Sequence, residues 1–213
     1  MILKEIDKRI IELGNKTINK KILDLGCGMN KYKKYFIDKN DFIGIDVEKS
    51  GRKDEQKKPD LFYDGKKLPF EDENFDLIIC TEVLEHVEDF ELVVKEIFRS
   101  LKKNGIAVIT MPFITAEHEI PYDFRRFTSY GIKKEFEKLG FTVKKFEKIL
   151  FGHVAIRQLL YGEMKRYEET GKVNFLVKFF LRSFFRLAFR ILGFFYKLDR
   201  VYFDNYIEIE KNN

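Results

Sequence analysis

The stretch Ile22-Leu-Asp-Leu-Gly-Cys-Gly28 decides the fold of this 213-residue chain. It begins as an apolar strand and ends in two glycines, Gly26 and Gly28. Glycine lets the backbone turn sharply and approach a ligand without a Cβ atom in the way. In an open α/β sheet, ligands bind at the carboxyl ends of the strands. The stretch therefore predicts a ligand-binding turn, although an ordinary strand–helix turn would use the same glycines.

Strands and helices alternate on both sides of this turn. Apolar strands are predicted at 20–27, 41–47, 60–64, 75–81, 105–113 and 141–150, and helices at 4–19, 89–103 and 128–140. The alternation predicts an α/β, Rossmann-like three-layer sandwich around a seven-stranded, mostly parallel sheet. The seventh strand is expected to be antiparallel and to lie at an edge of the sheet, because residues 206–210 alternate between apolar and charged.

The division expected along the chain is a core (1–150), a helical insertion (151–202) and a final edge strand of the core (203–213). The insertion is rich in Phe and Arg, with ten Lys and Arg against four Asp and Glu, a local charge of +6 in a chain of net charge +5. Its arginines make a bilayer crossing costly, at about 2.5–3.5 kcal/mol each near the bilayer centre. Residues 173–198 are instead expected to form a substrate lid, a homodimer interface or a helix lying on a membrane surface.

Cysteine content and charge pattern bear on the compartment. Hydrophobic residues make up 45% and charged residues 35% of the chain, as in a globular protein that buries a core. The two cysteines, Cys27 and Cys80, lack disulfide or zinc spacing, and the first residues lack the apolar segment of a signal peptide. We expect a cytoplasmic protein, with peripheral attachment to the inner membrane face as an option.

Two acidic residues follow the glycine turn at informative spacing. Asp46 closes the second strand about 20 residues after the glycines, where a carboxylate accepts hydrogen bonds from ribose hydroxyls. Asp64 follows the third strand, and a carboxylate at this position could accept a hydrogen bond from an adenine amino group. The GxGxxG pattern is absent, which argues against NAD.

The motifs together resemble the class I S-adenosylmethionine-dependent methyltransferases, and most closely the methyltransferase type 11 group that contains the ubiquinone-biosynthesis enzymes. The resemblance rests on Asp24–Gly28, Asp46, "DGKKLPF", "FDLIICTEVLEHV" and "LKKNGIAVITMP", and it covers about residues 20–150. The family often has a third glycine where this chain has Asn30.

The resemblance implies S-adenosyl-L-methionine as cofactor. Gly26, Cys27 and Gly28 would line its methionine and ribose side, and Cys80 and Thr81 would flank the sulfonium. The full set of cofactor residues implied is Asp24, Gly26, Cys27, Gly28, Asp46, Val47, Asp64, Gly65, Cys80 and Thr81.

A metal site is the next expectation. Glu82, Glu85 and His86 would share one face if this segment were helical, and two carboxylates with an imidazole can bind Mg²⁺ or a transition metal. This arrangement resembles one in ubiquinone-type O-methyltransferases, where it holds a divalent cation. The alternative is that Glu85 and His86 only order the turn beneath the cofactor.

The segment after the fifth strand is where the methyl acceptor should approach. His118 is predicted as the general base, with Tyr122 and Asp123 as further catalytic residues. Arg125 and Arg126 would clamp an anionic group of the acceptor. The alternative is an Asp123–Arg ion pair that pins the loop.

The predicted activity is O-methylation of a small, lipid-linked or glycan acceptor. Two alternatives stay open, namely a nucleic-acid methyltransferase that uses the basic C-terminal third, and a non-catalytic cofactor-binding scaffold. Nucleic acid is disfavoured because the basic residues alternate with Phe at helical spacing and no NPPY-like motif is present.

Overall fold

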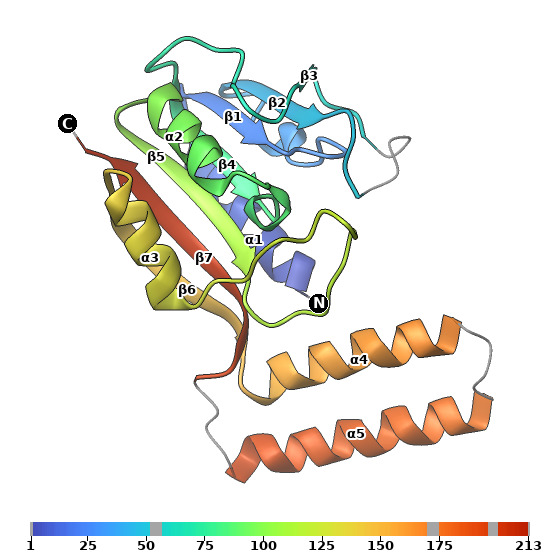
Figure 1. Ribbon diagram of the computed structural model, residues 1–213. Helices are drawn as coiled ribbons and strands as arrows, with labels where there is room; N and C mark the ends of the chain where they lie inside the picture. Colours follow the sequence, from blue (N-terminus) through green and yellow to red (C-terminus); the bar gives the residue numbers. More distant parts are fainter. Residues whose placement is uncertain (1, 52–56, 170–174, 196–199, 213) are drawn as a thin grey trace.

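The computed structural model describes residues 2–51, 57–169, 175–195 and 200–212, and its core is one seven-stranded sheet (Figure 1). The strand order is β3-β2-β1-β4-β5-β7-β6, and every strand except β7 points the same way. The strands are β1 (Lys21–Leu25), β2 (Asp41–Val47), β3 (Leu61–Tyr63), β4 (Phe75–Thr81), β5 (Leu101–Pro112), β6 (Phe141–Phe151) and β7 (Tyr202–Lys211). The predicted Rossmann-like α/β sheet with an antiparallel last strand is confirmed.

The predicted edge position of the last strand was wrong. Strand β7 lies between β5 and β6, so that Tyr206 is paired with Thr110 on one side and with Glu147 on the other. The charged residues that suggested an edge are balanced by lysines of β6, with Lys145 Nζ 3.6 Å from Glu208 and Lys144 Nζ 3.3 Å from Glu210. Strand β6 is the edge strand at this side of the sheet.

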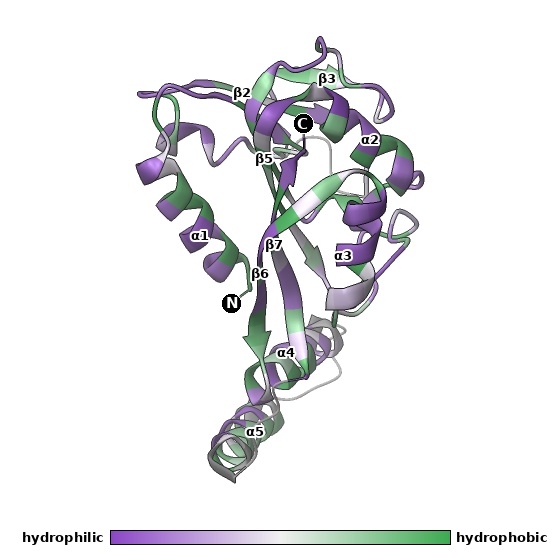
Figure 2. Cartoon of the chain, turned by 90° about the vertical axis from the view of Figure 1, so that its left-hand side faces the viewer, coloured by the Kyte–Doolittle hydropathy of each residue, from purple (hydrophilic) through white to green (hydrophobic). Residues whose placement is uncertain are grey.

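Helices cover both faces of the sheet. Helix α1 (Ile2–Lys16) packs on one face through Ile6 and Ile10, while α2 (Phe90–Ser100) and α3 (Ser129–Lys138) pack on the other (Figure 2). Side chains fix where α2 and α3 begin, because the carboxylate of Asp89 accepts from Leu92 N and the hydroxyl of Thr128 accepts from Gly131 N. Two short 3₁₀ turns, η1 (Lys33–Tyr35) and η3 (Leu84–His86), complete the core.

The insertion before the last strand is a helical hairpin of α4 (His153–Glu169) and α5 (Phe175–Phe195). Because β6 runs parallel to β1, β2, β4 and β5, its last residue lies at the sheet edge where those strands also end. Helix α4 begins two residues later, so the hairpin projects from this edge (Figure 1). Parts of the predicted surface 173–198 fall outside the described residues. Within the described ranges, no helix is long and apolar enough to cross a membrane.

Candidate active site

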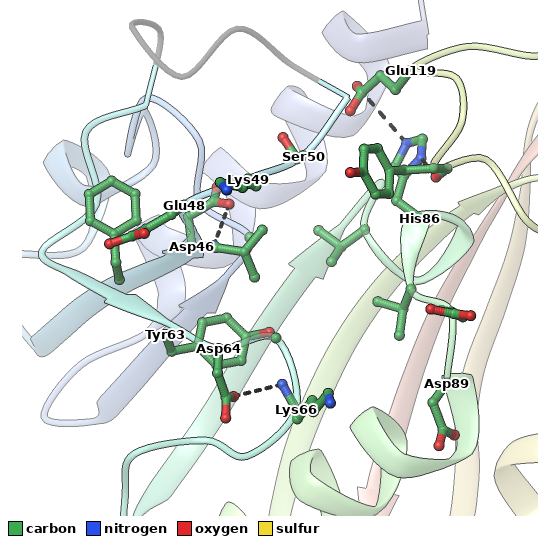
Figure 3. A pocket seen from close by; sticks show the side chains of 18 of the residues that line it. Asp46, Glu48, Lys49, Ser50, Tyr63, Asp64, Lys66, His86, Asp89 and Glu119 are labelled. Atoms are coloured by element: carbon green, nitrogen blue, oxygen red, sulfur yellow. Dashed lines mark hydrogen bonds and ion pairs between the residues drawn. The ribbon is translucent and has the colours of Figure 1, made fainter.

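A cavity of about 1290 Å³ opens at the carboxyl ends of the central strands. Figure 3 shows Asp46 and Asp64 on one wall, and His86 with Glu119 on the other. Five of the residues predicted to hold the cofactor line this cavity, namely Gly26, Asp46, Val47, Asp64 and Gly65. The structure thus brings together residues from the ends of β1, β2 and β3, as the α/β topology requires.

The glycine turn after β1 is fastened to β2. The backbone N–H groups of Gly26 and Cys27 both donate to Ile45 O, at 2.9 and 3.0 Å. Gly26 has a φ of +74°, and a Cβ atom there would overlap the side chain of Val83. Only glycine fits this position, because both its backbone conformation and the space around it exclude a side chain.

Asn30 stands where the related family often has a third glycine, and its backbone is left-handed. Its φ of +55° lies in the left-handed region, which Asn tolerates better than most residues. Its Nδ2 donates to Asp60 Oδ2 at 3.1 Å, and the same oxygen accepts from Gly44 N at 2.8 Å. Through Asp60, the Asn30 side chain therefore ties the turn to β2.

Asp46 is the most heavily bonded carboxylate of the cavity wall. Its Oδ2 accepts from Gly28 N at 2.8 Å, and its Oδ1 accepts from Val47 N at 2.7 Å. Lys57 Nζ lies 3.2 Å from the same Oδ1 and donates to Val47 O at 2.6 Å, with its side chain only 2% exposed. Sequence reasoning missed Lys57, because a contact made through an irregular loop leaves no periodic signal.

Asp64 stabilises its own turn. Its Oδ1 accepts from Lys66 N at 2.8 Å and from Lys67 N at 3.0 Å, and these donors hold the pKa of the carboxyl below its usual range. Gly65, at a φ of +78°, lets the chain turn away beside Val47. The carboxylate is thus ionised and fixed at the cavity rim.

The remaining predicted cofactor residues lie behind the lining. Asp24 and Cys80 are fully buried, and burial raises the pKa of Asp24 to about 7 and that of the Cys80 thiol well above its ordinary value. Burial likewise raises the pKa of Cys27. Both cysteines are therefore neutral thiols, and neither they nor Asp24, Gly28 or Thr81 are part of the cavity lining.

The wall opposite Asp46 begins at Glu82, which has a φ of +54°. Thr110 Oγ1 donates to Glu82 Oε1 at 2.8 Å. Asp204 is a buried neighbour of Glu82, and its pKa is raised well above its usual range, first by burial and then by the charge of Glu82. A non-glycine residue in this conformation is strained, and such strain concentrates at functional sites. The segment continues as the 3₁₀ turn η3, not as the α-helix that would align the predicted metal ligands.

The structure groups His118, rather than Glu82, with Glu85 and His86. One ligand atom from each lies within 4.8 Å of the others, and His86 Nε2 is 3.8 Å from Glu85 Oε1. Metal bonds of 2.0–2.1 Å at tetrahedral angles bring ligand atoms to about 3.3 Å from one another. The one printed separation, 3.8 Å between His86 Nε2 and Glu85 Oε1, is wider than this by about 0.5 Å, so this pair would have to close to share a tetrahedral ion.

The loop after β5 is pinned by an ion pair. Arg126 donates to both carboxylate oxygens of Asp123, at 2.6 and 2.7 Å, and His118 N donates to Asp123 Oδ2 at 3.0 Å. Burial opposes ionisation of Asp123, but the bonds from Arg126 hold its pKa at about 2. His118, Asp123 and Arg126 are not among the residues that line the cavity, whereas Tyr122 is. The pinning role weighed from the sequence is the arrangement observed.

Arg125 joins this loop to the wall that contains η3. Its guanidinium donates to Val87 O, to Leu84 O at 3.4 Å and to Glu88 O at 2.8 Å, and it lies 5.6 Å from the centre of the Phe90 ring. These donors are directed at backbone carbonyls, so the arginine predicted to bind an acceptor is placed to hold two loops together.

His86 is the imidazole that reaches the cavity. Its Nδ1 lies 2.6 Å from Tyr122 O, which makes Nδ1 the protonated nitrogen and leaves a lone pair on Nε2. Nε2 is 3.9 Å from Glu119 Oε1, and burial lowers the pKa of the ring (Figure 3). His118 stacks edge-to-face behind it, with ring centres 4.8 Å apart. Sequence reasoning missed Glu119, which lies two residues before Pro121 in an irregular segment.

These features define a class of protein. The sheet is parallel except for the interior strand β7. A glycine turn after β1 and a carboxylate at the end of β2 face the same cavity. This is the arrangement of class I methyltransferases. Residues 23–109 match the family described as a methyltransferase domain.

The chain is similar in sequence or in fold to three further proteins. The chain is 34% identical over 146 residues to an uncharacterized protein of Methanocaldococcus jannaschii, covering 65% of this chain and 63% of that protein. It is 34% identical over 99 residues to the ubiquinone biosynthesis O-methyltransferase of Pelagibacter ubique, covering 43% and 41%. Haemonchus contortus phosphoethanolamine N-methyltransferase 2, solved in complex with S-adenosyl-L-methionine, superposes with a TM-score of 0.60 at 16% identity, covering 98% of this chain and 53% of that one.

Residues 23–109 thus match a methyltransferase domain, and the chain has the fold of class I S-adenosylmethionine-dependent methyltransferases. Its matched part spans 63% or less of the length of these curated relatives.

Proposed function

We propose that this protein transfers a methyl group from S-adenosyl-L-methionine to an oxygen of an acceptor that enters between Glu119 and Tyr122. The observation that carries the proposal is the placement of Asp46 across one cavity from His86 and Glu119. The first wall suits a nucleoside, and the second offers groups that accept a proton.

The residues of the first wall fit the cofactor. Gly26 presents backbone without a Cβ atom, and Asp46 is held in place by two backbone N–H groups while it keeps acceptor capacity for ribose hydroxyls. Asp64 and Gly65 form the rim on which the adenine would lie. When bound, the cofactor supplies an already activated methyl group, so the protein chiefly aligns the reactants and excludes water.

His86, rather than His118, is the general base in this proposal. The bond from its Nδ1 to Tyr122 O fixes the ring orientation and leaves Nε2 as the nitrogen that can take up a proton, with Glu119 beside it to stabilise the charged ring. Nε2 is buried, so the acceptor would have to displace part of this wall to reach it. His118 and the Asp123–Arg126 pair hold the loop that carries Tyr122. The base matters only for a hydroxyl acceptor, which is why the proposal specifies oxygen.

The acceptor class is proposed as a small, lipid-linked or glycan hydroxyl compound. The test uses methyl-labelled cofactor with cell extract, separated into lipid and aqueous fractions. Label in one fraction, absent with Asp46→Ala, supports the proposal. If the protein binds S-adenosylhomocysteine in calorimetry yet labels nothing, it is a cofactor-binding scaffold and the proposed function is wrong.

A further inference from the structure

One face of α5 is apolar and exposed. Its members, here called the apolar stripe, are Val177, Phe180, Leu181, Phe184, Leu187 and Ile191. At about 100° per residue they fall within an arc of roughly 120°. Phe180 is 68% and Phe184 66% exposed, so the stripe presents large side chains fully to its surroundings. A contiguous apolar patch of this kind marks an interaction site.

The opposite side of α5 accounts for its packing within the chain. Phe189 is buried, Tyr161 Oη donates to Arg182 O at 3.3 Å, and Arg182 pairs with Glu168 at 2.6 Å. The hydrogen bond and the ion pair of Arg182 both go to α4, which lies between α5 and the sheet (Figure 2). The apolar stripe is therefore outside the contact with α4.

Positive charge flanks the stripe. Arg186 and Arg190 are exposed and lie on successive turns of α5. Viewed down the helix axis, Arg190 is about 60° from Leu187, the nearest residue of the apolar stripe, and Arg186 lies farther round. Arginine side chains of this length can keep their apolar stems at the stripe while the guanidinium reaches a polar layer. An exposed apolar face with basic residues on its flank is complementary to the headgroup boundary of an anionic bilayer.

The charges favour lipid over a second copy of the chain. Helix α5 contains no acidic residue, so an antiparallel pairing through two stripes would place arginines beside arginines. Like charges facing each other oppose association. Anionic headgroups would neutralise the same arginines.

We propose that α5 is a docking helix that lies on the surface of a membrane containing anionic phospholipid. The hairpin leaves the sheet edge at which the cavity opens, so docking turns the active-site edge toward the lipid. This deepens the proposed function, on which it rests for the acceptor class, by making the acceptor a membrane-resident amphiphile. The docking step itself needs no catalysis.

The test is vesicle flotation of the full chain, with phosphatidylcholine vesicles that contain or lack phosphatidylglycerol. We expect flotation with the anionic vesicles only. Phe180→Asp combined with Phe184→Asp should abolish it, and Arg186→Gln combined with Arg190→Gln should lower the partition coefficient about thirtyfold. Tyr130→Ser, which removes an aromatic residue 80% exposed on α3, is the matched control and should float like the unchanged protein.

Two further measurements separate the outcomes. Calorimetry with S-adenosylhomocysteine shows whether each variant is folded, and its result bears on the proposed function independently of flotation. Absence of flotation in a folded protein overturns the docking proposal. So does a concentration-dependent dimer in sedimentation that Phe180→Asp and Phe184→Asp dissolve without any effect of vesicles, because α5 would then be a subunit interface.

Discussion

Lys57 Nζ lies 3.2 Å from Asp46 Oδ1, so the carboxylate placed to bind a ribose already forms an ion pair with a buried lysine. The lysine is anchored by a second bond to Val47 O. This ion pair joins the loop that follows β2 to the end of that strand. The positive charge of Lys57 balances the negative charge of Asp46 at the cavity wall.

Lys57→Met should destabilise the protein, because it leaves a buried carboxylate without its counter-charge. Breaking a buried pair costs about 3 kcal/mol of unfolding free energy. Urea denaturation measures the loss, and Lys58→Met at an exposed neighbouring position should change little. Adding Asp46→Asn to Lys57→Met should recover part of the loss. Strictly additive effects of the two substitutions would contradict a direct pairing.

Gly26→Ala should abolish cofactor binding, because the new methyl group would overlap Val83 in a backbone conformation that disfavours any side chain. Calorimetry with S-adenosylhomocysteine measures it. The control is Gly162→Ala in α4, where a Cβ atom meets nothing within 4 Å. That change should leave binding intact and stabilise the chain by up to about 1 kcal/mol. Normal affinity of Gly26→Ala would mean that the turn is not at the ligand.

His86→Gln should lower kcat by about 10²–10⁴-fold and leave cofactor affinity unchanged, because the ring lies on the wall opposite Asp46 and a glutamine amide cannot take up a proton. His118→Ala should cause a smaller fall, since this ring lies behind His86. Steady-state kinetics with the acceptor, together with calorimetry, separate the two roles. A larger loss for His118→Ala than for His86→Gln would restore His118 as the base.

Asp24 should make stability depend on pH. Burial raises its pKa from 3.8 to about 7, so the folded state keeps a proton that the unfolded state releases. The stabilisation from this proton is complete below pH 3.8 and is lost as pH rises through about 7, with a slope of about 1.4 kcal/mol per pH unit. Asp24→Asn should remove this fall from the pH profile of unfolding free energy. The exposed Asp38→Asn serves as control, and parallel profiles for Asp24→Asn and the unchanged chain would contradict the assignment.

Local signals predicted part of the first cavity wall. Gly26 follows β1 directly and Asp46 is the last residue but one of β2, so their positions depend only on where a strand ends and on the parallel order of the sheet. The prediction that Glu82, Glu85 and His86 share a helical face was wrong, because the backbone adopts a positive φ at Glu82 and continues as a 3₁₀ turn. No periodicity reveals such a local conformation.

Other features depend on which distant segments meet. The lysines of β6 that balance Glu208 and Glu210 are more than 60 residues away in the chain, so the alternation of β7 alone could not reveal an interior strand. Lys57 and Glu119 reach the cavity from irregular loops in the same way. The helical insertion, by contrast, was visible as an abrupt change in composition.

The hairpin of α4 and α5 begins and ends at neighbouring positions of the sheet. Phe151 and Tyr202 are cross-strand partners, and Gly152 N donates to Val201 O at 2.6 Å. A tight turn could bridge the same two strands, so the insertion is a detachable module that leaves the methyltransferase sheet intact. Under the docking proposal, replacing this hairpin would change the surface that the protein meets without altering the cavity.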